Sequence, residues 1–319
     1  MTDSRYRRAA VIGAGTIGLS WATLFAAKGM HVAVNDPRHD LAEVVDRTVR
    51  QVAGTLPGGA RDPDELRALI ELQADLDSAV TGVDVVQENG PEDIAFKRQL
   101  FARIERSVPP TAMLLSSTSG LMPTDMSRDM TSPGRLLVGH PFNPPHVIPL
   151  VEVVAGTATE PAEVAAAVDF YRWLGKEPVV LHKEIGGFVA NRLQSALFRE
   201  SVSLVLQGVV DAEELDKVVT ESVGPRWATA GPFESYHLGG GPGGLRHLLE
   251  HLGPGMARRW ADLGQPELTP ETVDLLSSAT EERFRGRSYD ELAEIRDRKQ
   301  LAVLAARAAA GAPTEPGTA

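Results

Sequence analysis

The sequence predicts an α/β fold in which a doubly wound, mostly parallel sheet is followed by an all-helical C-terminal domain. Short β-branched runs alternate with helical patterns through the first half of the chain, a glycine-rich turn follows the first run, and strand patterns stop after Gly187. Alternating strands and helices are typical of parallel sheets with crossover helices. The length of 319 residues is sufficient for two domains.

Short runs of β-branched and apolar residues define the expected strands, and helical patterns lie between them. Helices are expected over residues 17–28 and 160–174. The second of these is followed by Gly175, which suits the position just after a helix C-terminus. The expected strands are residues 9–12, 31–35, 83–87, 113–116, 136–139, 151–154 and 179–181.

The second domain is expected to be helical. From Gly187 onward apolar residues recur at helical spacing, as in Phe188, Leu193 and Leu197. We place the domain boundary near Glu184, with one domain over residues 1–184 and another over 185–319. The run at 239–244, Gly-Gly-Gly-Pro-Gly-Gly, is interpreted as a connector, and residues 309–319 have the composition of a flexible tail.

The composition limits the partners. There are 32 basic and 43 acidic residues, a formal net charge of −11, which disfavours nucleic acid and anionic membranes because both require a basic surface. No apolar run approaches the roughly 18 residues of a membrane span, and no secretory signal is evident, so a cytoplasmic location is expected. The chain has no cysteine, which excludes disulfides and thiolate metal ligands. A small molecule is the expected ligand, and no metal ion is expected.

The segment VIGAGTIG, residues 11–18, places three glycines between the first strand and the first helix. A G-x-G-x-x-G pattern in this context is typical of a Rossmann-type dinucleotide-binding turn, because glycine permits the tight turn, the approach of a pyrophosphate and close helix packing. The helix N-terminus supplies amide donors and positive potential. The expected cofactor contacts are Gly13, Gly15, Thr16, Ile17 and Gly18.

The second strand leads to Asp36, eighteen residues after Gly18. A carboxylate at this place can accept hydrogen bonds from the adenosine ribose hydroxyls and repel a 2′-phosphate, which favours NAD over NADP. Arg38 lies close enough in sequence to keep NADP as an alternative.

The stretch VGHPFNPPHVIPLVEVV, residues 138–154, carries the expected chemistry. Hydride transfer from an alcohol requires a base for the hydroxyl proton, and His140 lies at the end of a strand, where doubly wound sheets bind their ligands. Glu152, inside an apolar strand, is expected to be buried and to bond the other imidazole nitrogen of His140. His146 lies in a proline-rich turn and is interpreted as a surface loop residue.

A family resemblance rests on the motifs GAGTIG, QENGPED followed by a lysine, SSTSG, GHPFNP, PLVEVV and GGFVANRL. Together and in this order they resemble the 3-hydroxyacyl-CoA dehydrogenase family over nearly the whole chain. The longer matches SSTSGLMP, GHPFNPPHVIPLVEVV, GPRWA, GPFE and RDRK are most similar to the branch that contains L-gulonate 3-dehydrogenase (lambda-crystallin) and carnitine 3-dehydrogenase.

The resemblance implies roles for individual residues. The catalytic histidine of the family corresponds to His140 and its carboxylate partner to Glu152. The serine and asparagine that bond the reacting oxygen correspond to Ser119 and Asn191. Further cofactor contacts are implied for Glu92, Lys97 and Asn143, and a homodimer is expected from the resemblance alone.

Two departures from the family pattern concern Ser117 and His237. Many relatives have asparagine in place of Ser117 and aspartate in place of His237. The second change lies at the substrate-proximal end of the helical domain, so it puts the substrate in doubt and leaves the redox chemistry unaffected.

The charge of residues 39–80 bears on the substrate. In acyl-CoA members this region carries lysines that meet the CoA phosphates, whereas here it holds four arginines, nine acidic residues and no lysine, a net charge of −5. This disfavours CoA. A free carboxylate would need its own partner, for which Arg226 is the candidate, and Trp227, with Phe233 and Tyr236, could line a site for a quaternary ammonium.

The sequence therefore predicts an NAD-dependent dehydrogenase that oxidises, reversibly, the 3-hydroxyl of a small L-gulonate-like or carnitine-like acid. Two alternatives remain. One is the same reaction on a short-chain 3-hydroxyacyl-CoA, and the other is a non-catalytic NAD-binding structural protein.

Overall fold

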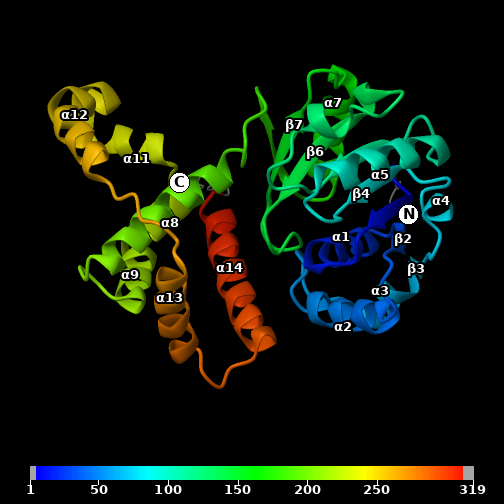
Figure 1. The fold of residues 1–319 in the computed structure, drawn as a ribbon, viewed down its shortest axis with the longest axis horizontal. Coiled ribbons are helices and arrows are strands. Elements are labelled where there is room, and N and C mark those ends of the chain that lie inside the picture. Colours follow the sequence, from blue (N-terminus) through cyan, green and yellow to red (C-terminus); the bar gives the residue numbers. More distant parts are fainter. Residues whose placement is uncertain (1–4, 312–319) are drawn as a thin grey trace, which may run out of the picture. The chain divides into compact units, whose positions relative to one another are not determined.

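The structure is a computed structural model, and it describes residues 5–311. The chain forms two units, one ending at Asn191 and one beginning at Arg192. Figure 1 traces both, from blue near the N-terminus to red near the C-terminus.

The first unit is built on one eight-stranded sheet with the strand order β3-β2-β1-β4-β5-β6-β7-β8. Neighbouring strands are parallel except β6 and β7, which pair antiparallel. The predicted Rossmann-type α/β fold is confirmed, although the short strand β3 was missed because three residues show no periodicity. The strands are β1 (Arg8–Ile12), β2 (His31–Asn35), β3 (Ile70–Leu72), β4 (Val85–Glu88), β5 (Met113–Ser116), β6 (Leu136–Pro141), β7 (Leu150–Ala155) and β8 (Glu177–Leu181).

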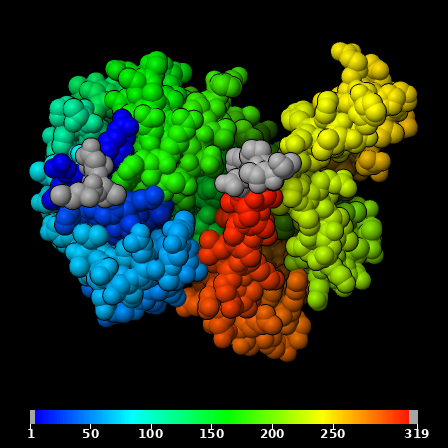
Figure 2. Space-filling view, turned by 180° about the vertical axis from the view of Figure 1, so that it is seen from behind, coloured from blue at the N-terminus to red at the C-terminus, as the bar shows by residue number. Residues whose placement is uncertain are grey.

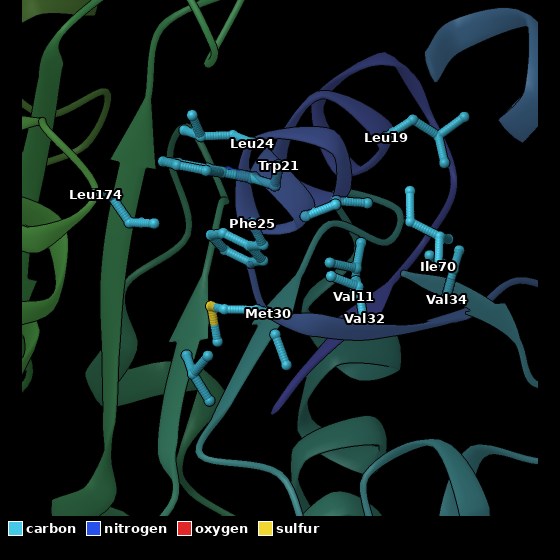
Figure 3. Packing of buried hydrophobic residues seen from close by; sticks show 14 of the residues in the cluster. Val11, Leu19, Trp21, Leu24, Phe25, Met30, Val32, Val34, Ile70 and Leu174 are labelled. Atoms are coloured by element: carbon cyan, nitrogen blue, oxygen red, sulfur yellow. The ribbon is translucent and has the colours of Figure 1, made fainter. Parts of the chain in front are cut away.

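Helices cover both faces of this sheet, with a separate buried apolar cluster under each layer. In the first cluster Trp21 and Phe25 of α1 lie with Val11 and Val32 of the strands (Figure 3). The second cluster includes Phe101 of α5. The helices are α1 (Thr16–Ala27), α2 (Leu41–Ala53), α3 (Pro63–Ala68), α4 (Leu76–Ala79), α5 (Ile94–Ser107), α6 (Pro123–Met126) and α7 (Pro161–Trp173), with a 3-10 turn at Pro133–Arg135.

The predicted site residues lie at one edge of the sheet. Strands β1, β4, β5 and β6 run parallel, so their carboxyl ends lie at the same edge, where such sheets bind ligands. Strand β7 runs back from that edge. His140 near the end of β6 therefore pairs in register with Glu152 near the beginning of β7.

The second unit is helical. Its described residues, 192–311, contain no strand, so the prediction of a helical C-terminal domain is confirmed. Residues 312–319 of the expected tail lie outside the described residues, and residues 309–311 end helix α14. The helices are α8 (Ala190–Leu206), α9 (Ala212–Val218), a π-helical turn (Val219–Val223), α10 (Gly224–Thr229), α11 (Pro232–Gly239), a 3-10 turn (Gly241–Gly243), α12 (Gly244–Asp262), α13 (Pro270–Arg283) and α14 (Tyr289–Gly311).

Within the second unit α11 and α12 pack on each other as a hairpin. Figures 1 and 2 both show this hairpin, in yellow, projecting away from α13 and α14. The expected connector at 239–244 joins its two helices. No helix among residues 5–311 combines the length and the apolar composition needed to cross a membrane.

Candidate active site and cofactor-binding turn

The glycine-rich turn has a backbone that side chains would obstruct. Gly13 adopts φ of +94°, and a Cβ there would lie 2.7 Å from the carbonyl oxygen of Asn89. A Cβ on Gly18 would lie 1.9 Å from the carbonyl oxygen of Gly13, whereas Gly15 faces open space. Helix α1 begins at Thr16 without a side-chain cap. Its first amides are therefore not used by a capping side chain, and the turn fits the pyrophosphate of a dinucleotide.

Asp36 lies directly beside this turn. Its Oδ2 accepts a hydrogen bond from the Ala14 amide at 2.7 Å, and its Oδ1 accepts one from the Arg38 amide at 2.9 Å. The Arg38 guanidinium forms two bonds to Asp40, at 2.7 and 2.9 Å. Because Arg38 is paired with a carboxylate, it is not a free cation for a 2′-phosphate.

A cavity of about 760 Å³ opens next to Asp36. Gly13, Gly15, Asn35 and Pro37 contribute to its walls. Its place at the carboxyl ends of β1 and β2 is where the adenosine of a bound dinucleotide lies in this type of sheet.

Lys97 is buried in an ion pair. Its ammonium lies 2.6 Å from Glu88 Oε1 and 3.9 Å from Glu92 Oε2, and its side chain is 1% exposed. Glu88 Oε2 also accepts a hydrogen bond from Ser116 at 2.6 Å. Glu88 was not among the predicted site residues, although the signal that indicated Glu152, an acid in an apolar strand, is also present in Val-Val-Gln-Glu.

Glu92 is hydrogen-bonded to the two residues Thr118 and Ser119, which follow β5. Its carboxylate accepts hydrogen bonds from the Thr118 hydroxyl at 2.7 and 2.8 Å, the Ser119 amide at 2.6 Å and the Ser119 hydroxyl at 3.0 Å. The structure thus brings Glu92, Lys97 and Ser119 together at one end of the sheet. Asn191 also reaches this place, because its amide group donates to the Ser119 carbonyl at 3.4 Å.

His140 and Glu152 form a buried pair at the same edge. The imidazole Nδ1 lies 2.9 Å from Glu152 Oε2, with the side chains 5% and 3% exposed. Glu152 Oε1 accepts two further hydrogen bonds, from the amides of Val189 and Ala190 at 3.0 Å each. A carboxylate can only accept, so Nδ1 carries the proton and Nε2 carries the lone pair of the neutral ring.

Two opposing effects act on the Glu152 carboxyl. Burial raises its pKa, whereas the hydrogen bonds from His140, Ala190 and Val189 lower it, and the net result is a pKa below the ordinary value. The carboxylate is therefore ionised near neutral pH and can stabilise a protonated imidazole.

Two aromatic rings enclose His140. Phe142 and Phe188 lie 4.8 and 5.3 Å from its ring, measured between centroids. Phe188 is fully buried and has φ of +50°, a backbone conformation that side chains rarely adopt. This conformation directs the next two amides, those of Val189 and Ala190, at Glu152.

Asn143 is exposed in the loop between β6 and β7. The interpretation of its neighbour His146 as a surface residue is wrong. His146 is 3% exposed, and its two ring nitrogens lie 2.8 Å from the Ser20 hydroxyl and 3.0 Å from the Thr55 hydroxyl. Since both nitrogens are bonded to hydroxyl groups, this side chain joins the loop to other parts of the fold.

The two departures from the family pattern also have structural partners. The Ser117 hydroxyl accepts hydrogen bonds from the Trp21 indole at 3.2 Å and from the Gln87 amide at 2.8 Å. In the second unit His237 Nδ1 accepts a hydrogen bond from the Leu245 amide at 3.2 Å, in the first turn of α12. Both side chains therefore make local structural bonds.

The residues suggested for substrate recognition lie on α10 and α11. Arg226 and Trp227 are exposed on α10. The rings of Phe233 and Tyr236 on α11 are exposed as well, at 79% and 47%. The described part of the chain does not assemble these rings into a box.

Comparison with known proteins identifies the family of the chain. The 3-hydroxyacyl-CoA dehydrogenase, NAD binding domain matches residues 8–185, and the 3-hydroxyacyl-CoA dehydrogenase, C-terminal domain matches residues 187–279. L-carnitine dehydrogenase of Streptomyces griseus subsp. griseus is 40% identical over 306 residues, which cover 94% of this chain and 90% of the relative. A 3-hydroxyacyl-CoA dehydrogenase of Gibberella moniliformis is 38% identical over 307 residues, 94% of this chain and 95% of the relative.

A solved structure is similar over nearly the whole length. FHMPC 5-dehydrogenase, an NAD+ dependent dismutase, has a TM-score of 0.78 and 29% identity, covering 95% of this chain and 99% of that one. Two domain matches over most of the chain, relatives at about 40% identity and the dinucleotide turn agree with one another. The chain therefore belongs to the 3-hydroxyacyl-CoA dehydrogenase family and is an NAD-dependent oxidoreductase.

Proposed function

We propose that this protein oxidises the 3-hydroxyl of a small hydroxy carboxylic acid to the 3-oxo acid, and that its substrate is carnitine-like, with L-gulonate the next candidate. The observation that carries the chemistry is the buried pair of His140 and Glu152, 2.9 Å apart, at the ligand-binding edge of the sheet.

The dinucleotide turn would hold NAD, which would supply the hydride acceptor for this oxidation. The Nε2 atom of His140 takes the hydroxyl proton, because Nδ1 is already bonded to Glu152. Glu152 fixes this tautomer and stabilises the positive charge that develops on the ring. Ser119 and Asn191 hydrogen-bond the reacting oxygen, and Gly13, Gly15, Thr16, Ile17, Gly18, Asp36, Glu92, Lys97 and Asn143 form the cofactor side.

The carnitine assignment is supported by relatives that are L-carnitine dehydrogenases at 40% and 41% identity. We assign Arg226 to the substrate carboxylate and Trp227 to the trimethylammonium group, because a guanidinium can bind a carboxylate through two bonds and an aromatic face attracts a quaternary ammonium.

A second candidate is a short 3-hydroxyacyl-CoA, which the Gibberella moniliformis relative favours. The charge of residues 39–80 opposes it. Two of the four arginines there are already paired with carboxylates, Arg50 with Asp64 at 2.8 Å and Arg67 with Asp46. Few cations are left for the phosphates of CoA.

A substrate screen tests this proposal. The purified protein is assayed for NADH formation with L-carnitine, L-gulonate, 3-hydroxybutyrate and 3-hydroxybutyryl-CoA. We expect the highest kcat/KM with L-carnitine. Strong activity with the thioester alone would overturn the assignment, and an absence of turnover with every substrate would favour a structural role.

We further propose that residues 1–184 form the NAD domain and that residues 185–319 form the substrate and dimerisation domain. The protein is proposed to be a homodimer. Its proposed location is the cytoplasm, where its cofactor NAD is available. Large apolar side chains are exposed on the α11–α12 hairpin, among them Phe233 at 79%, Leu238 at 67% and Trp260 at 64%. Exposed apolar surface of this kind is a mark of protein contacts. Gel filtration with a mass near that of the 34.2 kDa monomer would contradict the dimer.

A further inference from the structure

The loop between His140 and Glu152 has few backbone donors of its own. Proline occupies positions 141, 144, 145 and 149, and proline has no amide hydrogen. Inside the loop the amides of Val147 and Ile148 both donate to the Pro144 carbonyl, at 3.0 Å each. The buried carbonyls further along the loop must therefore find donors elsewhere.

Lys176 supplies them. Its ammonium donates to the carbonyls of Pro145 and, at 3.0 Å, of Ile148, and it lies 5.6 Å from the ring of Trp21. Lys176 is 4% exposed and forms no ion pair with any described residue. Both of its hydrogen bonds end on this one loop.

The local backbone places Lys176 beneath the loop. Helix α7 ends at Trp173, Gly175 turns the chain with φ of +86°, and the Lys176 amide donates to the Tyr171 carbonyl at 2.9 Å. The next residue, Glu177, begins β8 and pairs with Leu150, the first residue of β7. The lysine is thus fixed at the point where the loop returns into the sheet.

A lysine in this position is costly, because burial penalises its charge. Burial, with the nearby charge of Lys28, lowers the pKa of Lys176 to about 7. A methionine or leucine would fill the same space without this cost. The proposed proton transfer at His140 makes no use of the ammonium, so another contribution must explain it.

We propose that Lys176 is a positioning residue for the proline loop, residues 142–149. It holds Asn143 in place for NAD and prevents movement of the loop from displacing His140 and Glu152. The expected effect of Lys176 on NAD binding rests on the proposed contact between Asn143 and NAD. His146 is the second anchor of the same loop, through Ser20 and Thr55.

The test compares Lys176→Met with Lys183→Met, the same change at an exposed lysine. Hydrogen exchange is measured for peptides that cover residues 142–150, and KM for NAD and kcat are measured with the best substrate of the screen. We expect Lys176→Met to speed exchange in this loop and to raise KM for NAD about tenfold, since the two hydrogen bonds that Lys176 donates to the loop are lost. Lys183→Met should change neither.

The outcomes are distinct. A lower melting temperature for Lys176→Met with unchanged loop exchange and unchanged KM for NAD would mean that the lysine only fills space, and the proposal fails. If loop exchange rises while Asn143→Ala leaves KM for NAD unchanged, the anchoring of the loop is upheld and the role of Asn143 is rejected.

A second variant keeps the test valid if Lys176→Met does not fold. Lys176→Arg retains the charge and the donors. We expect it to preserve slow exchange in residues 142–150 and a KM for NAD within about threefold of wild type. If folded Lys176→Arg exchanges hydrogen in residues 142–150 as fast as Lys176→Met does, the proposal is overturned.

Discussion

His140 and His146 lie six residues apart in one segment, and both are buried, yet their surroundings differ. His140 has a carboxylate on Nδ1 and aromatic rings at its sides, whereas His146 has a hydroxyl group at each nitrogen. The first arrangement keeps Nε2 for a substrate and stabilises a positive ring. The second uses both nitrogens in hydrogen bonds to hydroxyl groups. A histidine's role in this fold is therefore decided by its partners more than by its burial.

The largest expected effect is that of His140→Asn. Because the base for the hydroxyl proton is lost, kcat should fall by about 10³-fold, within the usual range for general base catalysis. Binding of NAD should remain, since no expected cofactor contact is removed. Steady-state kinetics and NAD titration check this, with His31→Asn, an exposed histidine on β2, as the control.

The next effect is that of Glu152→Gln, which keeps the shape of the side chain and removes its charge. We expect kcat to fall by about 10²-fold, because the protonated ring loses its counter-charge. In the His140→Asn background the same change should add little, since the two residues act as a unit. If the loss of kcat in the double variant equals the product of the two single losses, the two residues do not act as a pair. Glu177→Gln on β8 is the exposed control.

His146→Leu tests the other half of the contrast. The change removes the side-chain hydrogen bonds to Ser20 and Thr55 from a buried position, so the free energy of unfolding should fall by about 2 kcal/mol. The kcat at saturating NAD should change less than about tenfold, far less than in His140→Asn. Urea unfolding and kinetics on the same preparation measure both quantities.

The last effect, which changes stability and leaves the proposed chemistry untouched, concerns pH and Lys176. Its pKa is about 7 in the folded chain and near the ordinary 10.5 in the unfolded chain. Between these values the unfolded chain binds more protons, so this residue makes the free energy of unfolding rise with pH, by up to about 1.4 kcal/mol per pH unit, and the gain is lost as pH falls toward 7. Urea unfolding at pH about 7 and about 9 should show the rise in wild type but not in Lys176→Met.

Much of this arrangement can be predicted from local pattern. Strand alternation and the glycine spacing predict the sheet and the dinucleotide turn, and an acid inside an apolar strand predicts a buried partner for Glu152. Such signals depend on residues close together in the chain. The sheet then brings His140 and Glu152 together because β6 and β7 are neighbours joined by one loop.

The remaining features depend on contacts between distant segments. Ser20 lies 126 residues before His146, and Thr55 lies 91 residues before it, so nothing near the proline turn indicates that this histidine is buried. The anchoring role of Lys176 is hidden for the same reason, since its acceptors are backbone carbonyls about 30 residues earlier, and carbonyls leave no sequence signal.

The most direct test of the account compares the two histidines in one experiment. His140→Ala and His146→Ala are titrated with NAD, and NADH formation from L-carnitine is then followed at saturating NAD. The account predicts that His140→Ala binds NAD as wild type does and loses about 10³-fold in turnover, while folded His146→Ala keeps most of it. Turnover in His140→Ala comparable to wild type, or an equal loss in both variants, would contradict the assignment of His140 as the base.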